Sequence, residues 1–139
     1  MRITLESDYA LKIVTALAEH DDVTDAKTIS EETAVTQRFT LKILHKLVLG
    51  DIVTSYKGAK GGYKLKATPE NITLKDVIEL IDGPVAIARC LDGDGGCALN
   101  HDKAGCIYHH IFEDISIEVA KKLQSITIAD VIKKAHSLI

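Results

Sequence analysis

The sequence contains no tryptophan and, in 139 residues, only two phenylalanines, four tyrosines, two prolines and one methionine. A core built from it must be aliphatic, which the 46% hydrophobic content can supply. No apolar run approaches the roughly 20 residues of a membrane-spanning helix, and the first residues do not resemble a signal peptide. We therefore expect one cytoplasmic domain, or a small domain with an appended helical arm.

Cysteine is also scarce, and its distribution is unusual. The three cysteines, Cys90, Cys97 and Cys106, share one stretch with four of the nine glycines. In a cytoplasmic protein such a cluster indicates metal ligands or redox thiols rather than a disulfide framework. Thiolates on flexible backbone suit a zinc ion or an iron–sulfur cluster. Three free thiols are the simplest alternative.

Charge is unevenly spread along the chain. The whole protein has a net charge of −3, whereas residues 36–66 hold seven Lys or Arg residues and one acid, Asp51. That segment therefore carries +6 and the remainder carries −9. A single basic stretch on an acidic body is typical of a protein that presents one face to phosphates, although a solvated lysine-rich surface gives the same pattern.

Hydrophobic periodicity predicts a mainly α-helical protein with one small β-hairpin. The predicted helices cover residues 8–20, 26–33, 36–50, 73–82, 107–125 and 128–137, and the strands cover 52–56 and 63–66. Thr36 is expected to cap the third helix and Gly50 to close it in the left-handed conformation. A short helix, a turn, a second helix and then a basic hairpin form a winged helix-turn-helix.

The candidate DNA contacts lie on the third helix and on the hairpin. Gln37 and Arg38 stand near the helix N-terminus, where base edges are usually contacted. The other candidates are lysines suited to phosphate. The full set is Gln37, Arg38, Lys42 and Lys46 in the helix and Lys57, Lys60 and Lys64 in the hairpin.

The helix predicted from residue 107 has a long apolar stripe. Ile107, Ile111, Ile115 and Val119 repeat every four residues. This stripe is long for so small a domain to cover, so we expect it to pair with the same helix of a second chain. The expected organisation is a DNA-binding domain over 1–83, a cysteine loop over 84–106 and a dimerisation helix with a last helix over 107–139.

Three motifs in this order resemble the Rrf2 family of bacterial winged-helix regulators, and in particular its IscR-like and NsrR-like iron–sulfur branches. They are the start Met1-Arg-Ile-Thr4, the hairpin Tyr56-Lys-Gly-Ala-Lys-Gly-Gly-Tyr63 and the segment Ile72-Thr-Leu-Lys-Asp-Val-Ile78. The cysteine loop, the long helix and Ser125-Ile-Thr-Ile-Ala-Asp-Val131 follow in family order. The resemblance covers essentially the whole chain.

The resemblance implies a homodimeric regulator that binds double-stranded operator DNA and has no enzymatic activity, small-molecule substrate or membrane partner. Its third helix would enter the major groove and its wing the adjacent minor groove. A cluster held by Cys90, Cys97, Cys106 and one further ligand would sense iron, redox state or nitric oxide.

The fourth ligand has two leading candidates, and His101 inside the loop ranks third. His109 stands three residues after Cys106, as in IscR-like proteins, and favours [2Fe–2S]. Asp8 matches the aspartate of NsrR-like proteins, which reaches the partner chain's cluster and goes with [4Fe–4S]. The gaps of six and eight residues between cysteines, against five in the commoner family loop, leave the cluster type open.

Three alternative functions stay open. They are a zinc-stabilised regulator, a cofactor-free regulator of the same family and a small electron-transfer iron–sulfur protein. Zinc sites usually include ligands two to four residues apart, and here only Cys106 and His109 satisfy that spacing. An electron-transfer protein would have no need of the basic hairpin.

Overall fold

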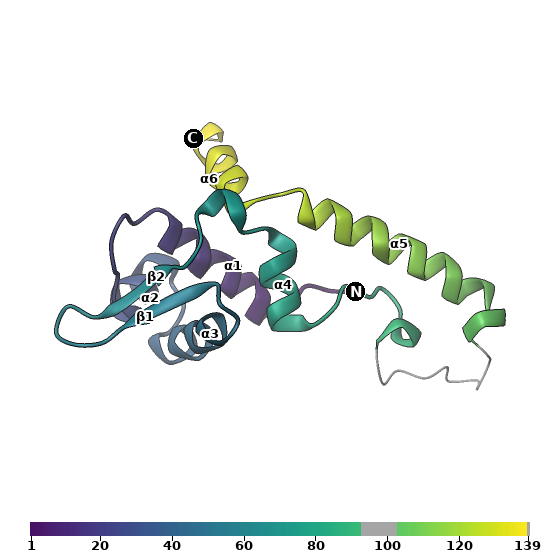
Figure 1. Ribbon diagram of the computed structural model, residues 1–139, viewed down its shortest axis with the longest axis horizontal. Coiled ribbons are helices and arrows are strands. Elements are labelled where there is room, and N and C mark those ends of the chain that lie inside the picture. Colours follow the sequence, from purple (N-terminus) through teal and green to yellow (C-terminus); the bar gives the residue numbers. More distant parts are fainter. Residues whose placement is uncertain (93–102, 139) are drawn as a thin grey trace.

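The computed structural model describes residues 1–92 and 103–138. Within these residues a winged helix-turn-helix body stands at one end and a long helix, α5, extends from it at the other (Figure 1). The elements follow in the order α1 (Leu5–Ala18), α2 (Ala26–Thr33), α3 (Gln37–Leu49), β1 (Val53–Tyr56), β2 (Gly62–Leu65), η1 (Pro69–Asn71), α4 (Leu74–Asp82), η2 (Arg89–Leu91), η3 (Lys103–Gly105), α5 (Ile107–Gln124) and α6 (Ile128–Ser137). The mainly α-helical class with one hairpin is confirmed.

Side-chain caps define where the first three helices begin. Thr4 accepts the Ser7 N–H and starts α1 at Leu5, three residues earlier than expected. Asp25 accepts the Thr28 N–H at 2.7 Å, and this bond holds the pKa of the Asp25 carboxyl below its usual range. Thr36 caps α3 as predicted.

The end of α3 differs from the prediction. Gly50 has a φ of −88°, and the left-handed residue is the next one, Asp51, with a φ of 61°. Gly50 instead leaves room for the side chain of Leu80 on α4, which a Cβ atom at residue 50 would force to shift. The glycine therefore permits close packing of two helices rather than an unusual backbone conformation.

The wing is a short antiparallel hairpin with a third, single-residue strand beside it. Val53 pairs with Leu65 and Tyr56 with Gly62. On the other side of β2, Thr24 exchanges both backbone hydrogen bonds with Tyr63, at 2.8 and 2.9 Å. The loop before α2 thereby fixes the wing to the helix-turn-helix.

The core is aliphatic, as the composition requires. It is centred on α1, whose Ile13 and Val14 are fully buried, and α3 packs against it through Ile43, Leu44 and Leu47. The α6 residue Ile128 is also fully buried in this cluster. The last helix, which follows α5 in the sequence, therefore belongs to the core of the winged-helix body.

A backbone pairing returns the chain from α5 to the body. Leu74 N–H donates to Ile126 O at 3.0 Å, and Ile128 N–H donates to Ile72 O at 2.8 Å. This pairing sets Thr73 opposite Thr127, and each threonine starts a helix with a capping box. Helices α4 and α6 thus begin side by side.

Helix α5 is attached to the body along one side only. Its Ser116 is 5% exposed and accepts the Ile87 N–H at 3.0 Å. Apolar side chains elsewhere around the helix are exposed, with Ile107 at 64% and Ile111 at 43%. No described helix is long and apolar enough to cross a membrane.

We expect Gly62→Ala to lower the free energy of unfolding by at least about 1 kcal/mol, because a Cβ atom there would meet the Thr24 backbone and disturb its pairing with Tyr63. Thermal unfolding followed by circular dichroism measures the effect. Gly58→Ala is the control, since Gly58 has a φ of 103° but open space around it. Equal losses in the two variants would show that backbone strain alone is responsible.

Candidate nucleic-acid interface and cysteine site

The outer face of α3 is accessible along its whole length. The helix buries Thr40, Ile43, Leu44 and Leu47 against the body. The exposed face therefore presents Gln37, Arg38, Leu41, Lys42 and His45. The two residues expected to contact bases, Gln37 and Arg38, occupy the first two helical positions, and the helix dipole there favours an approaching phosphate.

An aromatic pair supports this face. The Tyr9 and Phe39 rings meet edge to face, with centroids 5.6 Å apart. The Lys42 ammonium lies over Phe39, 5.4 Å from the ring centroid. The Lys42 side chain is therefore held against α3 while it stays exposed to an incoming phosphate.

Lys46 has a different environment from the other candidate lysines. Its Nζ lies 2.6 Å from Glu6 Oε1 on α1, and the two side chains are 39% and 21% exposed. This partly shielded ion pair joins the end of α3 to the start of α1. A DNA contact by Lys46 stays a prediction, and the contact that is present is internal.

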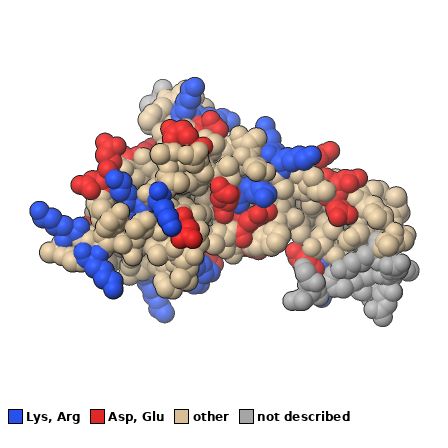
Figure 2. Space-filling view, in the orientation of Figure 1, with Lys and Arg blue, Asp and Glu red and all other residues tan. Residues whose placement is uncertain are grey.

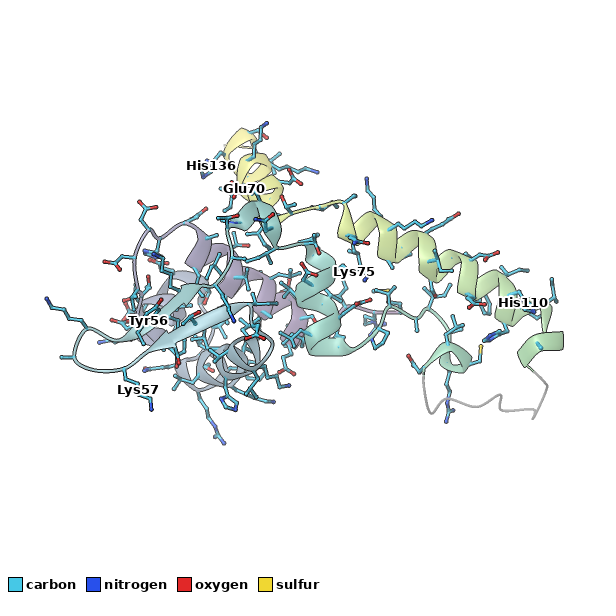
Figure 3. All side chains as sticks on the ribbon, in the orientation of Figure 1. Tyr56, Lys57, Glu70, Lys75, His110 and His136 are labelled. Atoms are coloured by element: carbon cyan, nitrogen blue, oxygen red, sulfur yellow. The ribbon has the colours of Figure 1, made fainter. Side chains whose placement is uncertain are left out.

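The wing presents its basic residues to solvent. Lys57, Lys60 and Lys64 are all exposed. Figure 2 shows Lys and Arg side chains projecting from the hairpin end of the molecule and from the underside, where α3 lies. Figure 3 shows Lys57 pointing away from the body at the hairpin tip. Hairpin and helix thus offer positive charge on one side of the body.

The cysteine site lies at the far end of the molecule from the wing. Cys90 is in the short helix η2, and its Sγ is 3.3 Å from Nδ1 of His109 in the first turn of α5. Cys106 directly precedes α5 at the cap position, where its side chain caps no backbone N–H. His110, labelled in Figure 3, hydrogen-bonds through Nε2 to Ala104 O at 2.8 Å and ties α5 to η3.

These donors fit a soft metal centre in chemistry and in spacing. Two ligands on one tetrahedral ion, at thiolate and imidazole bond lengths, are about 3.5 Å apart, close to the Cys90–His109 separation. Cys90 and Cys106 are both free thiols and half-buried. Among residues 1–92 and 103–138 no group of three or more potential ligands converges, and Cys97 lies outside the described residues.

The alternative ligand, Asp8, has a partner on its own helix. Its Oδ2 pairs with Lys12 Nζ at 2.8 Å, and both side chains are about half exposed. The two sequence candidates for the fourth position thus differ within one protomer, since His109 lies beside Cys90. Ligation by Asp8 from a partner chain stays a prediction.

Comparison with known proteins decides the family. The model of the family Rrf2, described as an iron-dependent transcriptional regulator, matches residues 3–134. This chain belongs to the Rrf2 family. Two relatives support the assignment across nearly its full length. An rrf2-like HTH-type regulator of Rhodobacter capsulatus is 31% identical, covering 94% of this chain and 91% of its own. The regulator NsrR of Oceanobacillus iheyensis is 25% identical and covers 100% and 95%.

Solved Rrf2-like structures share the fold. CymR, the global cysteine regulator of B. subtilis, has a TM-score of 0.77 at 25% identity and covers 96% of this chain and 98% of its own. The structure of IscR from T. potens has a TM-score of 0.76 at 23% identity and covers 97% and 88%. The winged-helix architecture is thereby confirmed, and the Rrf2 chain is a DNA-binding transcriptional regulator.

The sequence prediction did not include two features of this region, the exposed Leu41 and the Glu6–Lys46 ion pair. The exposed Leu41 falls outside the buried stripe, and a helical projection of residues 37–49 would have placed it beside Arg38 and Lys42. The Glu6–Lys46 pair joins residues 40 positions apart, and no local pattern indicates it.

We expect Glu6 and Lys46 to be coupled in stability. In a double-mutant cycle with Glu6→Gln and Lys46→Met, the coupling free energy should be about 0.5–1 kcal/mol, a modest value because both side chains keep contact with water. Urea unfolding of the four proteins measures it. Lys12→Met with Glu6→Gln is the control cycle, since Lys12 pairs with Asp8 instead. Equal couplings in the two cycles would contradict the assignment.

Proposed function

We propose that this Rrf2 regulator is a cytoplasmic homodimer whose affinity for operator DNA is controlled by an iron–sulfur cluster that senses iron, redox state or nitric oxide. The observation that carries the proposal is the contact between Cys90 and His109, which joins the end of the body to the first turn of α5. A group bound there would contact both the winged-helix body and α5.

Cys90, Cys106 and His109, with Cys97 from the segment outside the described residues, would hold the cluster. The proximity of His109 to Cys90 favours a [2Fe–2S] form with three thiolates and one imidazole. When bound, the cluster supplies a centre whose integrity depends on iron, oxidants and nitric oxide. The cysteines and His109 would supply the ligands of the cluster. The contacts around these ligands determine which parts of the protein would move when the cluster is lost.

The described contacts offer a route from the cysteine site to α3. Three residues before Cys90, Ile87 accepts a hydrogen bond from the N-terminal amine at 3.3 Å and donates one to Ser116 of α5. Residues 83–88 form the linker between α4 and η2. At the start of this linker, Asp82 accepts hydrogen bonds from the hydroxyl and the N–H of Thr4, the cap of α1.

The second half of the route runs through α1. The Glu6–Lys46 pair stands two residues after Thr4 and reaches the C-terminal half of α3. A displacement at Cys90 would therefore act on the start of α1 and, through it, on the DNA-facing helix. The proposed control is a change in the placement of α3 rather than a blocked surface.

The exposed side of α5 supports the homodimer. Ile107, Tyr108, Ile111 and Ile115 are 40–65% exposed and lie on one side of the helix, away from the Ser116 contact. Apolar area of this kind is typical of a subunit interface. A second copy of α5 offers a matching apolar stripe, and two recognition helices on one duplex suit a two-fold operator.

A second candidate is a regulator of the same family that works without a cluster and responds to a metabolite. The observation that favours it is the similar fold of CymR, described as a global cysteine regulator. In that case Cys90 and Cys106 would be ordinary thiols. Zinc in place of iron is a further variant, because its ligand chemistry is the same.

Protein purified without oxygen is expected to be coloured and to lose its visible absorbance on exposure to air, a chelator or nitric oxide. Cys90→Ala and Cys106→Ala should each abolish the colour, because each removes a thiolate ligand. Spectra with iron and sulfide analysis provide the measurement. Colourless protein with one zinc per chain would leave a zinc-stabilised regulator, and colourless metal-free protein would leave the cofactor-free one.

The fourth ligand is tested by a set of matched variants. His109→Ala should lower iron content or shift the spectrum, whereas His110→Ala should not, since His110 hydrogen-bonds to Ala104 O. A change in Asp8→Ala with none in His109→Ala would instead assign the ligand to Asp8.

We expect Ile111→Asp to convert the homodimer into monomers, because it places a charge in the middle of the apolar side of α5. Sedimentation velocity gives the mass. Ile117→Asp is the matched control, an isoleucine of the same helix, 47% exposed, on a different side. If both variants remain dimeric, this side of α5 is not the interface.

A further inference from the structure

One large aliphatic side chain stands on the polar outer face of α3. Leu41 is 42% exposed and lies one turn after Gln37 and one turn before His45, both exposed. It contributes nothing to the stripe that buries the helix, which consists of Thr40, Ile43, Leu44 and Leu47.

A single exposed leucine on a protein surface is ordinary, so its position has to carry the argument. Leu49, on the same helix, is more exposed, at 71%, but it is the last residue of α3. Leu41 is the fifth residue, flanked on the surface by Arg38 and Lys42. The N-terminal half of a recognition helix is the part that usually meets base edges.

The chemistry of the major groove specifies what such a side chain can recognise. A leucine has no hydrogen-bond donor or acceptor, and the apolar group in the groove is the 5-methyl group of thymine. Cytosine presents an amino group on that edge, and covering it with leucine would remove its water without a replacement partner. Leucine therefore favours thymine over cytosine.

We infer that Leu41 is a specificity-determining residue that packs on the 5-methyl group of a thymine in each operator half-site. The inference rests on the proposed entry of α3 into the major groove. Leu41 reads by apolar contact, while Gln37 and Arg38 beside it read by hydrogen bonding. Each half-site is then defined by both kinds of contact.

The probe is the duplex that the full-length wild-type protein selects from a random-sequence pool. Each thymine of that duplex is replaced in turn by deoxyuridine, which keeps base pairing and removes only the methyl group. At one thymine per half-site, wild-type affinity should fall about fourfold, the effect of one buried methyl group. The Leu41→Ala protein should show no loss at that thymine.

Leu41→Ala keeps a good helix former at an exposed position, so the fold is preserved, which circular dichroism verifies. Two further variants, Leu49→Ala and Leu41→Ile, make the result specific. Leu49→Ala removes the same side chain from the end of α3 and should respond to deoxyuridine as the wild type does. Leu41→Ile restores an aliphatic contact and should regain part of the methyl dependence.

The outcomes separate this inference from the proposed docking. If no deoxyuridine substitution affects wild-type and Leu41→Ala proteins differently, Leu41 does not contact a thymine methyl, even where Arg38→Ala still changes the selected sequence. If Arg38→Ala also selects the same sequence with the same preference, α3 does not read the major groove and both ideas fall.

Discussion

Burial of α1 is the constraint on which the described structure depends. The helices α2, α3, α4 and α6 and the strand β2 all pack against it. Ala10, Ile13, Val14 and Leu17 are at most 2% exposed. Because the core lacks large aromatic groups, many small aliphatic contacts must replace a few large ones, and close packing then matters at each of them. A displacement of α1 would therefore displace every element that packs against it.

This arrangement also links two parts of the protein that lie far apart. The exposed side of α3 and the Cys90–His109 contact do not touch, yet both are joined to the start of α1. Glu6 forms an ion pair with Lys46. Asp82, at the start of the linker to Cys90, accepts a hydrogen bond from the Thr4 hydroxyl. The N-terminal turn of α1 is therefore the place where a signal and a response would meet.

Local chemistry is what made much of the fold predictable. Thr36 and Thr127 are good caps placed before apolar periodic segments, and the structure uses both. The hairpin followed from glycines between two short β-prone segments. The start of α1 was placed too late because Ser7 and Thr4 are both suitable caps. Burial decided between them: Ser7 is fully buried inside the helix.

Long-range contacts were beyond prediction, because a single sequence does not show which distant residues meet. Nothing near Ile128 indicates that it enters the core of residues 1–83. The convergence of Cys90 with His109 was expected as shared ligation, and their 3.3 Å separation required the fold of η2 against α5. The contacts with DNA and with a second chain stay predictions, since neither partner is part of one chain's geometry.

The pairing of Thr73 with Thr127 has a consequence for autonomy. Because α6 supplies Ile128 to the core, the DNA-binding body is completed only by the last helix of the chain. Helix α5 is therefore connected to the body at both of its ends and is not an appended arm. A fragment ending before it would expose the surface that Ile128 covers. The body that carries α3 and the wing therefore shares its core with the segment that follows α5.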